Sequence, residues 1–166
     1  MSMANLERTL VVFKPDAVAR GLVGRIVQRF EDAGLKIVAM KMRMMDEEFT
    51  RKHYFDLEER LGKSVYDLAA SFVQQGPVIA MVLEGFEAVP PVRRLVGATY
   101  PAEAAPGTIR GDFAHQSKSY SLERNTPIAN LVHASGNSDE AKYEIDLWFS
   151  SAEQFDYQTL AERYTF

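Results

Sequence analysis

The stretch TLVVFKPD, from Thr9 to Asp16, contains the first apolar run of the chain and ends it abruptly. Its apolar core of two β-branched valines beside leucine and phenylalanine predicts a short buried strand. Pro15 and Asp16 are turn formers, so the strand is expected to stop just before them. Lys14 stands at this end, where a buried ammonium costs free energy unless it has a partner. The stretch therefore predicts a buried strand that carries a lysine at its carboxyl end.

Helices and strands alternate along the rest of the chain. Apolar residues recur at helical spacing from Val23 to Phe30, and Gly34 marks a stop. The elements predicted after this helix are a strand at 35–44, a helix opening at 46–48, a helix at 64–74, a strand at 78–83, a helix at 88–96, a strand at 131–132 and a helix through 141–149. Two β-α-β halves in this order favour an α/β (α+β) fold, a ferredoxin-like four-stranded antiparallel sheet covered by helices.

Length and composition limit the classes of protein. The 166 residues suit a single domain, 1–166, and 46% apolar with 25% charged residues is ordinary for a soluble globular protein. No apolar run approaches the length of a membrane span, and the first ten residues lack the pattern of a secretory signal. The chain has no cysteine, three histidines and a net charge of −4. We therefore expect a cytoplasmic protein without disulfides or a zinc site, and neither nucleic acid nor membrane as partner.

Two short motifs resemble nucleotide-binding signatures but lack their context. Gly62-Lys63-Ser64 matches the end of a P-loop, yet the glycine that the full pattern requires is replaced by Leu57. Gly21 and Gly24 have the GxxG spacing of one RNA-binding module, which is a weak signal in an acidic chain. We exclude the P-loop and favour a helix start for Gly21.

NLVHASG, residues 130–136, places His133 at the predicted end of a strand and follows it with small residues. Position alone favours a surface or hydrogen-bonded histidine, and the small residues could simply form a turn. Three cationic residues favour a functional role for His133: Lys14, Arg93 and Arg110. Arg110 stands at the end of a long Gly/Pro/Ala-rich loop at about 98–109. Each alone is more often a salt-bridge partner, but arginine can grip phosphate oxygens bidentately. Together with His133 they describe an anion cradle around a nucleophile, as phosphoryl transfer requires.

The same residues carry a resemblance to a known family. The chain closely resembles nucleoside diphosphate kinase from about Glu7 to Phe149, through the motifs KPD-x-V-x-RGL-x-G, PGTIRGDF and N-x-x-H-x-S in the right order. The resemblance implies a ping-pong transfer of the γ-phosphate from a nucleoside triphosphate to a diphosphate, with Mg²⁺ and a phosphohistidine intermediate. It also implies maintenance of the NTP and dNTP pools and assembly as a homo-oligomer, with a hexamer favoured over a tetramer.

The family's functional residues map onto individual positions of this chain. The resemblance implies that His133 is the nucleophile, that Glu144 orients its imidazole and that Ser135 supports Glu144. Tyr54 matches the tyrosine beside the active histidine, and Asn130 the residue that bonds the ribose. The implied phosphate-binding set is Lys14, Arg93, Thr99 and Arg110. Tyr66 is the candidate for stacking on the base, and Mg²⁺ is expected to bridge phosphate oxygens with few protein ligands.

Several departures from the family pattern concern the base and the assembly. Ala17 replaces the glycine of KPDG, and Gly136 replaces an aspartate, which removes a carboxylate near the site. The segment 58–70 is longer than usual, an insertion lies near 114–127, and a C-terminal extension covers 150–166. A catalytically inactive family member would lack one of the polar residues above, and none is missing. An RNA-binding module would require exposed aromatic residues on the strands and a basic face, which the aliphatic strands and acidic charge disfavour.

Overall fold

The computed structural model describes residues 6–160 and 162–165. Its elements in chain order are β1 (Leu6–Phe13), α1 (Pro15–Ala19), α2 (Val23–Asp32), β2 (Lys36–Arg43), α3 (Glu47–His53), α4 (Leu57–Leu61), α5 (Lys63–Val73), β3 (Val78–Phe86), α6 (Val89–Val96), η1 (Pro101–Glu103), α7 (Ile109–Phe113), α8 (Lys118–Arg124), β4 (Val132–Ala134), α9 (Ser138–Trp148), η2 (Ser151–Glu153) and α10 (Glu162–Thr165). The predicted domain also includes residues 1–5, 161 and 166, which lie outside the described part.

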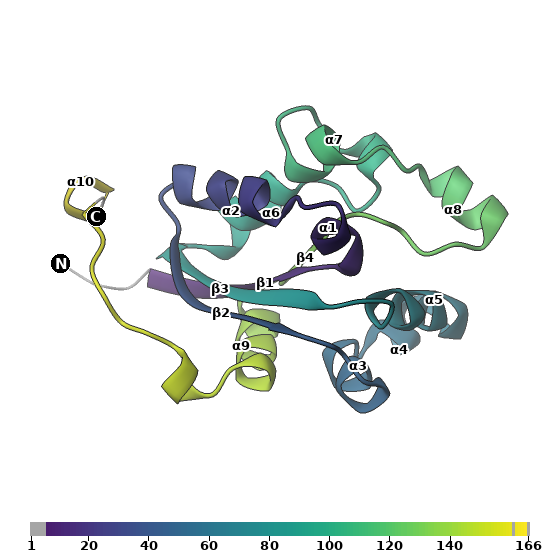
Figure 1. Ribbon diagram of the computed structural model, residues 1–166, viewed down its shortest axis with the longest axis horizontal. Helices are drawn as coiled ribbons and strands as arrows, with labels where there is room; N and C mark the ends of the chain where they lie inside the picture. Colours follow the sequence, from purple (N-terminus) through teal and green to yellow (C-terminus); the bar gives the residue numbers. More distant parts are fainter. Residues whose placement is uncertain (1–5, 161, 166) are drawn as a thin grey trace.

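Four strands form one sheet in the order β2-β3-β1-β4, and every neighbouring pair is antiparallel. Helices cover both faces: α2 and α6 lie on one side, and α9 and α3 on the other (Figure 1). This arrangement confirms the predicted ferredoxin-like sheet. The predicted buried strand is β1, and the structure places it inside the sheet, where it pairs with β3 over its whole length and with β4 at its carboxyl end.

Alternate residues of β1 enter two separate cores, because side chains of a strand point to opposite faces. Val11 and Phe13 pack with the helices of the α2 and α6 face, and Leu10 and Val12 pack with Trp148 of α9. All four of these β1 side chains are buried. The strand is therefore fixed on both faces, which makes it a rigid support for the residue that follows it.

The structure corrects the prediction in two places. His133 lies inside the short strand β4, whereas the predicted strand ended before it at Val132. No helix or strand was predicted in the insertion near 114–127, but it contains helix α8, which is capped by the Ser117 hydroxyl. A helix of only seven residues shows too little periodicity to be recognised in a polar segment.

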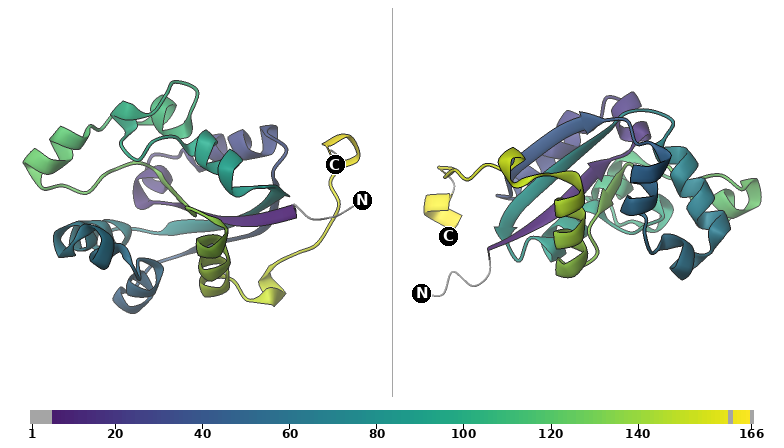
Figure 2. Two further views of the ribbon diagram at one scale, coloured as in Figure 1. Left: turned by 180° about the vertical axis from the view of Figure 1, so that it is seen from behind. Right: turned by 90° about the horizontal axis from the view of Figure 1, so that it is seen from below.

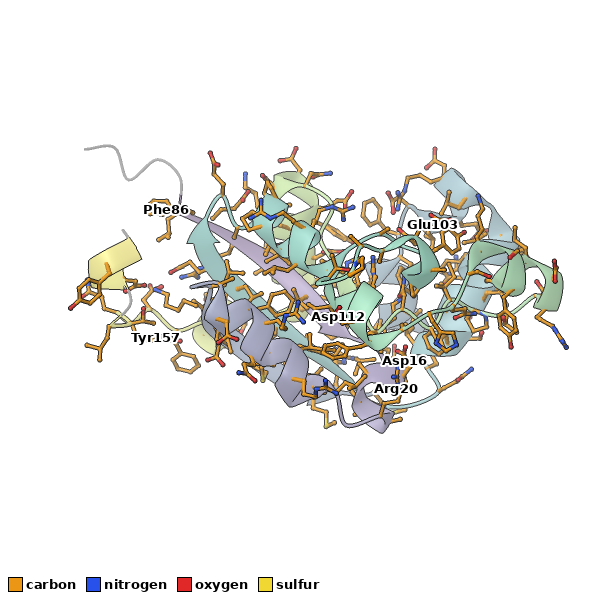
Figure 3. The ribbon with its side chains drawn as sticks, turned by 90° about the horizontal axis from the view of Figure 1, so that it is seen from above. Asp16, Arg20, Phe86, Glu103, Asp112 and Tyr157 are labelled. Atoms are coloured by element: carbon orange, nitrogen blue, oxygen red, sulfur yellow. The ribbon has the colours of Figure 1, made fainter. Side chains whose placement is uncertain are left out.

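The C-terminal extension packs as an arm along the edge strand β2. The amide of Phe155 donates to the carbonyl of Val38 at 2.9 Å, and the Tyr157 hydroxyl donates to the carbonyl of Ile37 at 2.6 Å. The arm runs toward the end of the sheet where the chain begins (Figure 2). In Figure 3, Tyr157 lies toward the left end of the molecule, and Asp16 lies right of its middle. The described helices include none long and apolar enough to cross a membrane.

Candidate active site

Lys14 lies where β1 passes into α1, as predicted. Its ammonium Nζ donates to Asn130 Oδ1 at 2.7 Å, and its backbone amide donates to the carbonyl of Leu131 at 2.8 Å. Burial lowers the pKa of Lys14 to about 8, and repulsion from Arg110 adds to the shift. An anion bound here would raise this pKa again, because a nearby opposite charge favours the charged form. The site is thus prepared for a negatively charged ligand.

Leu131, just before β4, has a left-handed backbone with φ of 71°, which is strained for a branched residue. Two contacts hold it in place: its carbonyl accepts from Lys14, and its amide donates to Asp16 Oδ2 at 3.1 Å. The other oxygen, Asp16 Oδ1, is buried without a hydrogen-bond partner among the described residues. Asp16 belongs to the KPD motif but was not predicted as a site residue; it positions the loop that carries Asn130.

Arg110 on α7 is anchored by three carbonyl oxygens. Its guanidinium donates to the carbonyls of Asn130 at 3.1 Å, Gly97 at 2.9 Å and Val132 at 2.6 Å. Burial, with a contribution from Arg93, lowers the pKa of Arg110 to about 10. Carbonyl oxygens do not neutralise the positive charge, so the guanidinium keeps its charge available for an anion.

Asn130, Thr99 and Arg93 complete the predicted polar set on neighbouring segments. Asn130 is buried, and its Nδ2 donates to the carbonyl of exposed Thr99 at 2.8 Å. Arg93 on α6 is exposed and directs Nη1 to the carbonyl of Ala134 at 3.5 Å, a long contact next to His133. The structure therefore brings Lys14, Arg110 and Asn130 together and leaves Arg93 with a weakly held guanidinium.

His133, Glu144 and Ser135 form a chain of hydrogen bonds between β4 and α9. His133 Nε2 lies 2.6 Å from Glu144 Oε1, and the Ser135 hydroxyl donates to Glu144 Oε2 at 2.5 Å. Ser135 Oγ accepts in turn from the amide of Leu10 at 3.2 Å. Both carboxylate oxygens of Glu144 are thus engaged, and the chain ends on the backbone of the central strand β1.

The negative charge of Glu144 determines which nitrogen of the His133 imidazole carries the proton. Burial raises the pKa of Glu144, but the attraction of His133 and the hydrogen bonds from His133 and Ser135 outweigh it and lower the pKa to about 2. An ionised carboxylate can only accept hydrogen bonds, so Nε2 must carry the proton that it donates to Oε1. In a neutral His133 the lone pair then resides on Nδ1.

His53, at the end of α3, was not predicted as a site residue. Its ring lies edge-on to the His133 ring, with centroids 4.7 Å apart, and its Nδ1 accepts from Trp148 Nε1 at 3.2 Å. Burial lowers the pKa of His53 to about 3, and His133 contributes to the shift. A neutral imidazole therefore packs against the predicted nucleophile. The sequence offered one signal, its place just before Tyr54, but none for its partner Trp148.

The two predicted tyrosines occupy different surroundings. Tyr54 lies beside His53, with ring centroids 4.7 Å apart, and burial followed by Glu144 raises the pKa of its hydroxyl. Tyr66 on α5 is only 5% exposed, and the guanidinium of Arg51 lies 4.9 Å from the centre of its ring. This burial favours packing over base stacking for Tyr66, whose predicted role stays without support from the geometry.

Ala17 and Gly136 are the two departures from the family pattern near the site, and neither disturbs the residues around His133. Ala17 is fully buried in the core on the α2 and α6 face. The amide of Gly136 donates to Glu140 Oε2 at 2.9 Å, so a carboxylate from α9 already serves this backbone group. A Cβ added at Gly136 would meet only the flexible end of Glu140. The missing aspartate therefore leaves the His133–Glu144–Ser135 chain intact.

Among the described residues, the group of metal-binding type is His53, His133 and Glu144. It does not suit Mg²⁺, which prefers an octahedron of oxygen ligands and keeps several waters. Two of its three ligands are imidazoles, and Glu144 is already bonded to His133 and Ser135. The cradle of Lys14 and Arg110 is cationic. A magnesium ion at this site would therefore depend on the oxygens of a bound phosphate chain.

Comparisons with known proteins agree with this geometry. The sequence model of the family "Nucleoside diphosphate kinase" matches residues 7–154. A nucleoside diphosphate kinase of Pyrococcus horikoshii is 48% identical over 160 residues, which are 96% of each chain. Nucleoside diphosphate kinase B of Rattus norvegicus is 42% identical over 164 residues, which are 99% of each chain.

Solved structures extend the similarity to the fold. The nucleoside diphosphate kinase of Borrelia burgdorferi, a transition-state mimic with bound vanadate and ADP, has a TM-score of 0.95 and 44% identity, and the match covers 99% of this chain and 98% of that one. A halophilic nucleoside diphosphate kinase from Halobacterium salinarum in complex with CDP has a TM-score of 0.84 and 41% identity, over 96% and 98% of the two chains. The chain therefore belongs to the nucleoside diphosphate kinase family, whose members are phosphotransferases that act on nucleotides.

Proposed function

We propose that this chain transfers the γ-phosphate of a nucleoside triphosphate to a nucleoside diphosphate in two steps, through a phosphohistidine at His133. The observation that carries the proposal is the bond from His133 Nε2 to Glu144 Oε1 at 2.6 Å, which directs the lone pair to Nδ1. An activated nucleophile held by a third group is the usual arrangement for covalent catalysis, which divides one difficult step into two.

In the first step the Nδ1 lone pair attacks the γ-phosphorus of the triphosphate. The bond from this phosphorus to the bridging oxygen breaks, and its electron pair leaves with the diphosphate. The second step reverses these events on another diphosphate, whose terminal oxygen attacks the phosphohistidine and restores neutral His133. The proton on Nε2 remains between His133 and Glu144 in both steps, because that carboxylate stabilises the positive charge on the imidazole.

The cations of the cradle serve the phosphate chain. Lys14, Arg93 and Arg110, with the Thr99 hydroxyl, would bind the phosphate oxygens and stabilise charge that moves from the γ-phosphate to the leaving oxygen. Asn130 lies between Lys14 and the Thr99 carbonyl, which suits a contact with the ribose. Tyr54 keeps its proton, so its hydroxyl would act as a donor near His133.

Mg²⁺ is part of the proposal as a substrate-bound cofactor. When bound to the phosphate chain it supplies charge neutralisation, and no protein residue is assigned as its ligand. The relatives whose structures contain vanadate with ADP, or CDP, support a nucleotide site. Maintenance of NTP and dNTP pools, a cytoplasmic location and a homo-oligomer, with a hexamer favoured, remain predictions. Light scattering of the purified protein measures the oligomer size directly.

Incubation with γ-labelled ATP and Mg²⁺ tests the proposed function. Wild-type protein should acquire an acid-labile label that any added nucleoside diphosphate removes, whereas His133→Gln should acquire none. His115→Gln is the matched control, since exposed His115 lies outside the site and its variant should label like the wild type. Absence of label on the wild type, or label that persists on His133→Gln, would contradict the phosphohistidine.

A further inference from the structure

A cleft of about 520 Å³ opens between α5 and the end of α8. One wall consists of Lys63, Ser64, Asp67, Leu68 and Ser71, which recur at helical spacing and so share one face of α5. The other wall is Asn125, which ends α8 in a left-handed conformation with φ of 47°. Five of these six described residues are polar or charged, so the cleft presents hydrogen-bonding groups rather than an apolar surface.

Both segments that line this cleft extend to residues close to Lys14. At the far end of α5, the Phe72 ring lies 6.0 Å from Lys14 Nζ. On the other side, the chain runs from Asn125 to Asn130, whose Oδ1 accepts from the same Nζ at 2.7 Å. Ser64 precedes Phe72 by eight residues, so it lies about 12 Å along the helix from the phosphate-binding end, at about 1.5 Å per residue. A nucleotide whose phosphates bind at Lys14 would extend its base along α5 toward this cleft.

The polar groups of the cleft suit the edge of a base. The Asn125 amide offers a donor and an acceptor, and the Ser64 hydroxyl can act as either. The Ser71 hydroxyl already donates to the carbonyl of Leu68 at 3.0 Å. Asparagine pairs well with the donor and acceptor edge of adenine. Asp67 is occupied by Lys63, whose Nζ lies 2.7 Å and 2.8 Å from its two carboxylate oxygens. Asn125 and Ser64 are therefore the better candidates for contacts with the base.

We propose that Asn125 at the end of the inserted helix, and Ser64 opposite it on α5, hydrogen-bond to the base of the nucleotide and set the preference of this chain among nucleoside diphosphates. The inference rests on the proposed function, since it assumes that the phosphates bind at Lys14. The insertion at 114–127 then serves recognition: α8 carries Asn125 to the outer end of the site.

Steady-state transfer to ADP, GDP, CDP and UDP tests the inference with Asn125→Gly and Ser64→Ala. Glycine accepts the left-handed backbone of residue 125 without strain, so the first variant removes only the side chain. We expect the KM to rise about two- to tenfold, the size of one lost hydrogen bond, by unequal factors for the four bases and with little change in kcat. Glu123→Ala, an exposed truncation on the same helix, is the matched control and should change nothing.

Phosphoramidate separates this inference from the proposed function, because it is a phosphoryl donor without a base. Its rate of histidine phosphorylation should be the same in wild type, Asn125→Gly and Ser64→Ala. Unchanged KM values, a rise equal for all four bases, or a parallel loss with phosphoramidate would overturn the assignment of the two residues. Failure of the proposed function would look different, since the wild type itself would then transfer no phosphate.

Discussion

The two ends of the proposed nucleotide site differ in how their side chains are held. At the inner end, Glu144 and Ser135 are buried and their polar atoms are bonded to one another, to His133 or to the backbone of β1. At the outer end, Ser64 and Asn125 are exposed and face a cleft. The inner end therefore suits the chemistry, which needs one fixed geometry. The outer end suits recognition of the base, which tolerates variation in side-chain position.

This contrast follows from the elements that carry each end. His133 lies on a strand paired with β1, whose side chains are buried on both faces, so the imidazole is held by the sheet. Asn125 lies at the end of the short helix α8, and Ser64 in the first turn of α5. Substitutions at the inner end should therefore affect catalysis strongly, and those at the outer end should affect binding modestly.

Arg110→Met should give the largest effect. The guanidinium is proposed to stabilise charge in the transition state, and loss of one such group typically lowers catalysis by about 10²- to 10³-fold. Its bonds to three carbonyl groups also order the loop around Asn130. Measurement of kcat/KM with ADP should show this loss, while the neighbouring exposed Arg94→Met should stay near the wild-type value. A fall in kcat/KM of less than threefold for Arg110→Met would contradict the strong effect expected at the inner end of the site.

Glu144→Gln should lower kcat on the order of 10- to 100-fold, the size known for partners that orient a functional imidazole. The amide can offer a donor to Nε2 and so favour the wrong tautomer of His133. Because the substitution conserves shape, KM for the diphosphate should change little. Single-turnover labelling with γ-labelled ATP measures the step directly. An unchanged labelling rate would show that the bond between His133 and Glu144 does not control nucleophilicity.

The pH dependence of the free energy of unfolding should reveal the lowered pKa of His53. Its pKa is about 3 in the folded protein and 6.5 when unperturbed, so below pH 6.5 the unfolded chain binds a proton that the native chain does not. The free energy of unfolding should therefore fall by up to about 1.4 kcal/mol per pH unit as the pH decreases from 6.5. Glu144, whose pKa drops from 4.5 to about 2 on folding, adds a fall in the same direction only below about pH 4.5.

Urea unfolding at several pH values between 6.5 and 4.5 isolates the contribution of His53. His53→Asn, which keeps an acceptor for Trp148 Nε1, should reduce the slope of unfolding free energy against pH in this window. An equal slope in wild type and variant would show that folding does not lower the pKa of His53, and would contradict the prediction.

Gly136→Ala should give the smallest effect. The added Cβ meets the flexible end of Glu140 and no backbone, and the residue lies outside the His133–Glu144–Ser135 chain. Stability should change by less than about 1 kcal/mol, as for most exposed substitutions, and kcat should stay within about twofold. Thermal unfolding and steady-state kinetics measure both quantities. A loss above tenfold in kcat would mean that the turn after β4 belongs to the catalytic apparatus.

Sequence patterns predicted the fold where long apolar periodicities were present. β1 and β3 bury continuous apolar stretches and α2 buries apolar residues at helical spacing, and these patterns predicted the three elements. β4 has only three residues, so its end was misplaced by two positions and His133 was expected just beyond it. The polar segment that forms α8 lacks an apolar face, and short helices of this kind depend on capping rather than periodicity.

The sequence predicted those site residues whose side chains have an evident chemical use, as phosphate ligands or as a nucleophile. Lys14, Arg110, Asn130 and His133 are far apart along the chain, and the structure brings them to one end of the sheet. The roles of Asp16 and His53 could not be predicted, because each depends on a tertiary partner: the strained Leu131 amide for one and Trp148 for the other. Tyr66 was proposed for stacking because it is an aromatic residue near the position of the family's base platform, and its burial could not be read from the sequence.

The central claim is that Glu144 holds Nε2 of His133 and leaves Nδ1 to accept the phosphoryl group. The most direct measurement is NMR of the phosphorylated enzyme with nitrogen-labelled histidine, which locates the phosphorus on one ring nitrogen through its coupling. The account predicts phosphorus on Nδ1 of His133, with the Nε2 proton retained. Phosphorus on Nε2, or on a residue other than His133, would contradict it.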